Sequence, residues 1–211
     1  VVLLAIAASA YYTGHRLRVL LDLSNRWLLP VIFIVVVAGA LVAAGLAVRS
    51  TNSLVGTLYV WGGYAITLQA YLLILLLAHY VIQLGWSLPP KGSALVIIAL
   101  AVVATLAGSI LAFRFSVRET EIPISKLNGE LRVLQISDVH LGHHRGKDYL
   151  EKVVAEANRQ NPDLVLITGD LVDSDVALLP GVLDPLSTLT TPAYFVTGNH
   201  EKTVDLERAL A

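Results

Sequence analysis

The chain has 211 residues, of which 55% are apolar and 15% charged, and its mean hydropathy is +0.69. Soluble domains carry about a quarter charged residues, so this composition excludes an ordinary soluble protein and predicts a membrane protein. The net charge of −1 and the absence of a Lys/Arg block argue against a nucleic-acid partner. Because the chain has no cysteine, disulfides, thiolate zinc sites and a cysteine nucleophile are excluded.

Apolar residues dominate the first 115 positions, whereas most charged residues follow Arg114. We therefore expect a transmembrane helical region over 1–115, a polar linker over 116–130 and a soluble domain over 131–211. The chain begins at Val1 without a methionine and ends at Ala211. We expect it to be an internal piece of a longer protein.

The first region predicts about four membrane spans. Residues 28–48 contain no charged side chain, and a helix of this length extends about 31 Å, which matches a hydrocarbon core of about 30 Å. Residues 58–84 and 94–113 predict two further spans, and residues 1–10 are typical of the end of a truncated first span.

Two polar residues fall inside the second complete span, Gln69 and His79. Polar groups in lipid often mark a functional site. We expect the simpler structural roles here, with Gln69 in an interhelical hydrogen bond and His79 near the membrane interface.

The distribution of Lys and Arg indicates the orientation of the spans. Arg16, Arg18 and Arg26 lie in the first predicted loop and Lys91 in the third, whereas the second carries only Arg49. Because Lys and Arg favour cytoplasmic loops, the soluble domain is predicted to be extracytoplasmic.

The soluble region predicts alternating strands and helices. Its predicted strands are buried apolar runs, and its second helix is interrupted by Pro180 and Pro185. The order is strand 131–136, helix 148–160, strand 164–167, helix 176–189 and strand 194–196. This pattern, with right-handed crossovers, is typical of an α/β fold with a largely parallel sheet. Ligands of such sheets bind beyond the carboxyl ends of the strands.

Three short strings follow the three predicted strands, and together they predict a two-metal site. Asp138 and His140 are separated by one residue. On an extended strand exit both side chains would therefore point to the same side and could bind one ion. Asp170 has two carboxylate oxygens with which to bridge two ions, and Asn199 offers an amide oxygen to the second. Two such ions activate a bridging hydroxide for in-line attack at phosphorus.

The third string also supplies an acid. His200 follows a predicted ligand in sequence but points elsewhere, which suits it to protonate a leaving group. Asp173 is placed to accept a hydrogen bond from the His200 ring and hold its tautomer.

Asp138-Val139-His140, Gly169-Asp170-Leu171-Val172-Asp173 and Gly198-Asn199-His200-Glu201 resemble the first three signature motifs of calcineurin-like metallophosphoesterases. The resemblance covers 131–201 and is greatest to the membrane-associated bacterial branch. It implies an αββα sandwich, of which 131–211 is the N-terminal half, in a bacterial plasma membrane protein.

By the same resemblance, Asp138 and His140 hold the first metal, Asp170 bridges and Asn199 holds the second. His200 and Asp173 form an acid dyad, and Glu201 supports the ligands from behind. The cofactors implied are two divalent ions, among Mn, Fe, Zn, Mg and Co.

The family's remaining motifs, a lone histidine and a Gly-His-x-His string, do not follow Glu201 in this chain. His143 and His144 are too close to the first motif to replace them; we interpret them as solvent-facing loop residues, with phosphate contact as the alternative. The chain alone is therefore expected to bind metal weakly and to be inactive.

The leading functional interpretation is a membrane-anchored, metal-dependent phosphoesterase that acts on phosphomonoester, phosphodiester or pyrophosphate bonds, with a lipid-linked substrate favoured by the membrane region. A non-catalytic membrane sensor or scaffold with a degenerate phosphoesterase domain stays open as the alternative. A transporter ranks third, because the spans carry no charge for a coupled ion pathway.

Overall fold

The computed structural model describes residues 1–125 and 129–203. The chain divides into two compact units, which are described separately below. The helical unit comprises Val1–Gly45 and Leu58–Phe115, and the α/β unit comprises Leu46–Thr57 and the described part of Ser116–Ala211.

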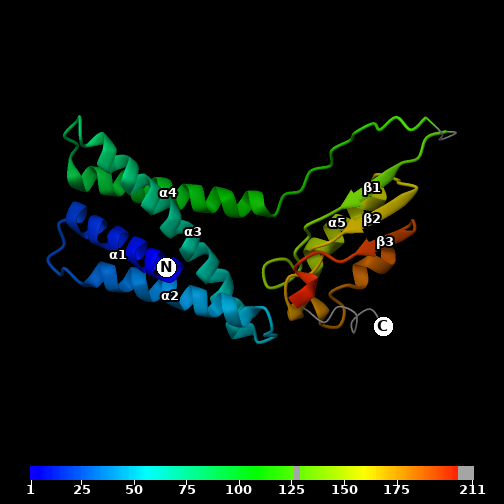
Figure 1. Cartoon of the computed structure of the whole chain (residues 1–211), viewed down its shortest axis with the longest axis horizontal. Coiled ribbons are helices and arrows are strands. Elements are labelled where there is room, and N and C mark those ends of the chain that lie inside the picture. The colour runs from blue at the N-terminus through cyan, green and yellow to red at the C-terminus, as the bar shows by residue number, and fades with distance from the viewer. Residues whose placement is uncertain (126–128, 204–211) are drawn as a thin grey trace. The chain divides into compact units, whose positions relative to one another are not determined.

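Four long helices form most of the first region: α1 (Val2–Leu21), α2 (Leu28–Ala47), α3 (Ser53–Ile82) and α4 (Pro90–Ala112) (Figure 1). Among the described residues, α2, α3 and α4 are long and apolar enough to cross a membrane. Side chains such as Val35 and Leu95, each 63% exposed, present the apolar surface that a lipid environment requires. The three uninterrupted apolar runs are thus confirmed as helices, and they support a membrane location.

Helix α1 differs from the prediction. It does not end near residue 10 but continues to Leu21, so that Arg16 and Arg18 lie in the helix and not in a loop. Arginine has a high helix propensity and is favourable in a last turn, where it faces the negative end of the helix dipole. Asp22 then ends the helix in a left-handed conformation with φ 59°. The fourth span stays a prediction, because α1 is as long as α2 but, with Arg16 and Arg18 inside it, is not among the helices apolar enough to be identified as spans.

The helical unit has its own core. Its main cluster of buried apolar side chains comes from α1, α3 and α4: Leu17, Leu20, Leu72, Leu76, Ala94, Ile97 and Ala101. Within this unit Gln69 donates a hydrogen bond of 2.9 Å to the hydroxyl of Thr13, which is the interhelical bond expected for Gln69.

The α/β unit is built on a parallel sheet of β1 (Val133–Ile136), β2 (Leu164–Thr168) and β3 (Ala193–Val196), in that order (Figure 1). Leu134 pairs with Val165, and Ile167 pairs with Phe195. The crossover between β1 and β2 contains α5 (Lys147–Arg159). The predicted α/β arrangement is therefore confirmed, and all three carboxyl ends meet at one edge of the sheet.

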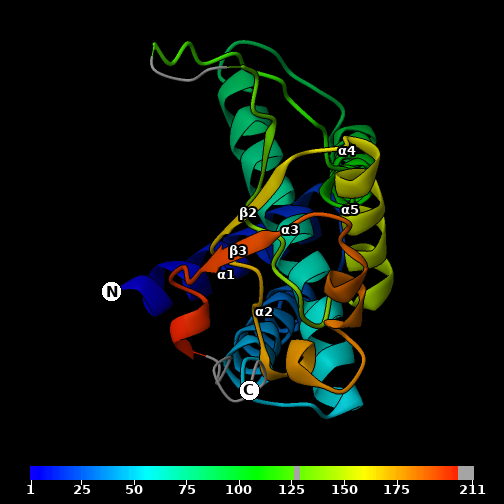
Figure 2. The same cartoon turned by 90° about the vertical axis from the view of Figure 1, so that its right-hand side faces the viewer.

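One face of the sheet carries the core of the unit. Leu150 and Val154 of α5 pack with Val165 and Ile167 of β2, and α5 lies beside the sheet in Figure 2. The opposite face is open: Val133 is 42% exposed and Tyr194 is 65% exposed. The prediction that all three strands are buried is thus correct only for β2, because the outer strands pack on one face.

The second predicted helix, over 176–189, does not form. Two short 3₁₀-helices replace it, η1 (Asp175–Leu178) and η2 (Asp184–Thr188). Pro180 and Pro185 each lack a backbone donor, and Gly181 adopts φ 85° between them. Two prolines this close interrupt an α-helix and do not merely kink it.

Candidate metal centre

The exits of β1 and β2 stay linked after the strands end. The backbone N–H of His140 donates to the carbonyl of Asp170 at 2.9 Å, and that of Leu141 donates to Leu171 at 2.8 Å. A further bond of 2.7 Å runs from Asp173 N to the carbonyl of Leu141. The first two sequence strings are therefore held side by side by main-chain hydrogen bonds.

Apolar residues between the polar ones anchor both strings. Val139 and Leu141 in the first, and Leu171 and Val172 in the second, are all buried in the core of the unit. Each such side chain stabilises the folded state by about 1.5–3 kcal/mol relative to exposure. Because these neighbours point into the core, the polar side chains between them are directed to the sheet edge.

The backbone at the predicted ligands is unusual. Asp138, His140 and Asp170 adopt φ of 59°, 52° and 53°, and among the described residues only two other non-glycine residues have positive φ. Such conformations are sparsely populated and cluster at functional sites. The extended strand exit assumed for Asp138 and His140 is therefore wrong: the chain turns at each residue, and their side chains converge nonetheless.

The structure brings the predicted ligands into two groups that share His140. Asp138, His140 and Asp170 form one, and His140, Asp173 and His200 form the other. Within each group the potential ligand atoms lie within 4.8 Å of one another. Residues from three separate turns, up to 62 positions apart in sequence, are thus assembled at one edge of the sheet.

Asp173 lies between the two imidazoles of the second group. Its Oδ1 is 2.5 Å from Nδ1 of His200 and 3.6 Å from Nδ1 of His140. The two histidine rings meet edge to face, with centroids 4.6 Å apart. The Asp173–His200 pair therefore has the geometry of a histidine oriented by a carboxylate.

Asp170 connects the second string to the third. Its Oδ1 accepts a 3.0 Å hydrogen bond from the backbone N–H of His200. Asn199 is exposed in the turn just before His200. The structure thus gathers Asp138, His140, Asp170, Asp173 and His200, whereas Asn199 lies beside them.

Glu201 holds the second and third strings together. It is 4% exposed, and its carboxylate accepts hydrogen bonds from the backbone N–H groups of Asp170 (3.0 Å), Val172 (3.0 Å) and Gly198 (2.6 Å). Burial by itself raises the pKa of this carboxyl, but the three backbone donors together outweigh burial, so the pKa lies below its usual value. Glu201 is therefore an ionised clamp behind the site.

Two glycines allow the second and third strings to cross. A Cβ on Gly169 would lie 2.8 Å from the Cα of Gly198, and a Cβ on Gly198 would lie 2.2 Å from Oδ1 of Asp170. Gly169 also has φ 88°. Any larger side chain at either position would push Asp170 from its place.

Sequence reasoning missed the role of Arg145. Its guanidinium donates to the carbonyls of Val139 (3.0 Å) and Asp138 (3.4 Å), and it lies 5.0 Å from the ring centroid of Tyr149. The only signal in the sequence is a basic residue shortly after the first motif. Arg145 therefore braces the first string through its backbone.

The two histidines near Arg145, His143 and His144, differ in exposure. His143 is half-buried, whereas His144 is exposed, as predicted for a loop residue. Partial burial lowers the pKa of His144, Arg145 lowers it further, and Asp173 acts in the opposite direction. His144 thus lies within electrostatic reach of Asp173.

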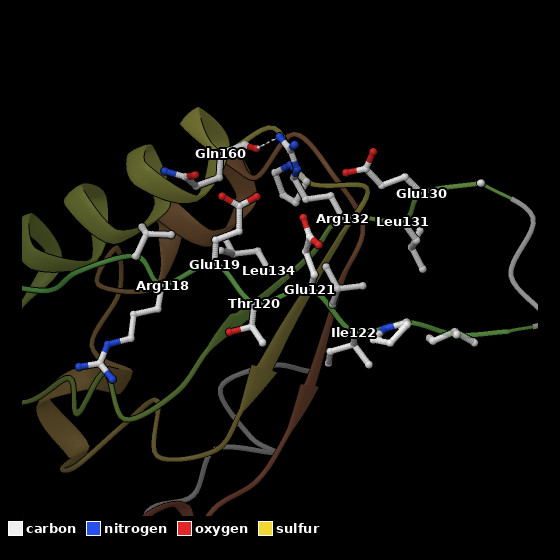
Figure 3. A pocket seen from close by; sticks show the side chains of 16 residues that line it. Arg118, Glu119, Thr120, Glu121, Ile122, Glu130, Leu131, Arg132, Leu134 and Gln160 are labelled. Carbon is white, nitrogen blue, oxygen red and sulfur yellow. Dashed lines mark hydrogen bonds between the residues drawn. The ribbon is translucent and has the colours of Figure 1, made fainter.

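A pocket of the α/β unit lies apart from this centre. It is lined by the linker residues 117–124, by residues 129–134 and by Gln160 and Pro162 (Figure 3). Arg132 donates there to the carbonyl of Gln160 at 3.3 Å, which is the dashed bond in the figure. None of the predicted ligands lines this pocket.

The gathered residues suit a divalent metal. Carboxylate oxygens and imidazole nitrogens are donors that divalent ions such as Mn, Fe and Zn accept, and both groups at this edge of the sheet offer them. The left-handed ligand residues support the same interpretation.

Comparison with known proteins agrees with this chemistry. Residues 131–210 match the family model of the calcineurin-like phosphoesterases. Residues 131–210 are therefore similar to the calcineurin-like phosphoesterases, and three apolar helices long enough to span a membrane precede them.

Named relatives occur in animals and bacteria. A transmembrane protein with metallophosphoesterase domain from Danio rerio is 43% identical over 96 residues, which are 42% of this chain and 22% of the relative. An uncharacterized metallophosphoesterase from Helicobacter pylori is 39% identical over 90 residues, 42% of this chain and 24% of the relative. The chain thus spans about a quarter of the length of these relatives. No solved structure matches it significantly.

Proposed function

We propose that this chain provides the membrane region and the first part of the catalytic centre of a metal-dependent phosphoesterase. The observation that carries the proposal is the convergence of Asp138, His140, Asp170, Asp173 and His200 within two adjoining groups at the carboxyl edge of the sheet. Family membership of residues 131–210 supports the reaction class.

Asp138 and His140 would hold one divalent ion, Asp170 would bridge to a second, and Asn199 would complete its shell from the neighbouring turn. Bound ions of this kind supply Lewis acidity and lower the pKa of bound water. Asp170 keeps its position through the bond from His200 N and through the clamp of Glu201 on its own backbone.

His200 would deliver the proton that the leaving oxygen needs. Asp173 accepts a hydrogen bond from Nδ1 of His200, which fixes the orientation of the ring. The Nε2–H of His200 is then the donor to the leaving group.

A lipid-linked phosphate or pyrophosphate ester is the substrate class we favour. Three candidate spans in the same chain would place the domain at a membrane surface, where such esters are concentrated. Arg16 and Arg18 near the end of α1 and Arg26 in the connection that follows outnumber Arg49 in the connection between α2 and α3. This bias supports an extracytoplasmic domain in a plasma membrane.

The test is manganese-dependent hydrolysis of bis(p-nitrophenyl) phosphate by the complete protein and its Asp170→Asn variant. We expect the variant to lose about 10²-fold or more in rate, because one bridging charge is removed. Asp148→Asn, the same change at an exposed position in the first turn of α5, is the matched control and should retain the rate.

Equal rates for the wild-type protein and Asp170→Asn would contradict the bridging role. No metal-dependent hydrolysis by the complete protein, on this diester or on phosphomonoester and lipid pyrophosphate substrates, would favour the alternative of a non-catalytic sensor or scaffold.

A further inference from the structure

The helical unit contains a buried histidine that the phosphoesterase chemistry does not use. His79 of α3 is 5% exposed, and both of its ring nitrogens are buried without a hydrogen-bond partner. Buried polar atoms are nearly always hydrogen-bonded, and each one left unsatisfied costs about 1–3 kcal/mol. An apolar residue at this position would avoid that cost, so the imidazole indicates a polar partner from outside the chain.

Arg16 of α1 lies beside this histidine. The two side chains are close enough for their charges to interact, and the Nε of Arg16 is also buried without a partner. The Nη2 of Arg16 donates to the side-chain oxygen of Gln83, one helical turn after His79, at 3.4 Å. Arg16, His79 and Gln83 therefore form a cluster of hydrogen-bond donors between two helices, which we call the Arg16–His79 cluster.

No carboxylate of the helical unit neutralises Arg16. Asp22 is the only acidic residue among positions 1–115, and it already lies 3.5 Å from Lys91. A guanidinium in an apolar helical unit needs a counter-ion, and the helical unit itself does not supply one.

The position of the cluster identifies the kind of anion. The end of α1, the end of α3 and the beginning of α4 lie at the same end of the helical unit (Figure 1). Tyr80 beside His79, Trp86 in the α3–α4 connection and Trp27 before α2 are 52%, 71% and 54% exposed. Exposed tryptophan and tyrosine mark the level of the lipid head groups.

We propose that the Arg16–His79 cluster binds the phosphate group of an anionic membrane lipid. The guanidinium and the imidazole N–H donate to phosphate oxygens, which gives charge-assisted hydrogen bonds and satisfies atoms that the protein leaves unpaired. Basic pockets between membrane helices are suited to such head groups. The site uses no residue of the α/β unit, so its test stands whatever the phosphoesterase assay shows.

The experiment measures phosphatidic acid binding to the complete protein in phosphatidylcholine nanodiscs, by native mass spectrometry with titration of the lipid. We expect Arg16→Gln to weaken binding by about tenfold or more, which corresponds to about 1.4 kcal/mol. Arg26→Gln removes the same charge from the connection between α1 and α2 and should change the affinity by less than about twofold.

Two further variants keep the test independent of folding. Arg16→Lys retains the charge but removes Nε, and His79→Phe retains a ring but removes both nitrogens. Both should weaken binding without lowering the unfolding midpoint in pure phosphatidylcholine, because each removes a buried polar atom that the protein leaves unpaired. Equal losses for Arg16→Gln and Arg26→Gln would overturn the proposal in favour of diffuse surface charge. Displacement of the lipid by millimolar inorganic phosphate would overturn the lipid assignment in favour of a free phosphate.

Discussion

Asp170 occupies the most constrained position of the candidate centre. Its φ is 53°, its carboxylate accepts from His200 N, and its own N–H donates to Glu201. The strain of a left-handed aspartate is tolerated because these two hydrogen bonds and the buried neighbours Leu171 and Val172 hold the turn.

Replacing Gly198 by alanine should disturb this turn. The new Cβ would lie 2.2 Å from Oδ1 of Asp170 and 2.6 Å from its backbone nitrogen. We expect a loss of about 1–3 kcal/mol in stability and a fall in metal-dependent activity, because the backbone has to shift. Calorimetry of the complete protein measures the first effect. Gly146→Ala is the control, since a Cβ there meets nothing within 4 Å; equal midpoints for the two variants would refute the close crossing.

The acid role of His200 predicts a dependence on the leaving group. His200→Gln should reduce kcat by about 10²–10⁴-fold for an alkyl phosphodiester, whose leaving oxygen needs a proton. The loss should be much smaller for a p-nitrophenyl ester, because p-nitrophenolate leaves without protonation. Asp173→Asn should show the same pattern to a lesser degree, since its shortest contact with the site is with the His200 ring. A uniform loss on both substrates would indicate a binding role for His200 instead.

At the scale of elements, α5 packs against the sheet whose carboxyl edge carries the candidate centre. Its apolar residues Leu150 and Val154 pack on β2, and they share the buried cluster with Val139 and Leu141 of the first motif. The alternation of charged and apolar residues along this helix identified that face correctly from the sequence. The two prolines after β2 also predicted an interruption of the second helix. Their effect is stronger than a kink, because two 3₁₀-helices form in place of one α-helix.

Leu150→Ala should therefore destabilise the α/β unit and weaken metal binding with it. Leu150 is 1% exposed, and a Leu→Ala change at such a site costs about 2–5 kcal/mol. Glu151→Ala, at the adjacent exposed position, should stay within about 0.5 kcal/mol of the wild-type protein. Unfolding midpoints of the complete protein separate the two cases. A cost for Glu151→Ala as large as that for Leu150→Ala would contradict the assigned face.

At the scale of the whole molecule, a membrane-spanning region and a phosphoesterase domain occupy one chain. Helices α2, α3 and α4 meet the length and apolarity of membrane spans, and the named relatives include transmembrane proteins with the same domain. The two features together place the proposed chemistry in a membrane protein.

Membrane integration predicts a specific fractionation. The complete protein should stay in the membrane pellet after an alkaline carbonate wash and should enter the supernatant only with detergent, because three apolar helices cannot leave the bilayer for water. Release by carbonate or by high salt would contradict the spans and indicate a peripheral attachment. Protease treatment of sealed vesicles of known sidedness would then test the extracytoplasmic placement of the domain.

The sequence by itself determined the division into two regions, the apolar spans, the parallel α/β order and the three ligand-bearing strings. These features depend on local composition and on periods of 2 and 3.6 residues, which can be read along the chain. It did not determine that α1 continues past Arg16 and Arg18, or that β1 and β3 leave one face open, because both depend on which surfaces other elements cover.

Only the tertiary structure decided how the strings meet. The left-handed turns at Asp138, His140 and Asp170, the position of Asp173 between two imidazoles, and the clamp of Glu201 on three backbone donors join residues far apart in sequence. No local pattern encodes such contacts. They follow from the parallel register of the strands, which brings three separate chain turns to one edge and there fixes the distances between their side chains.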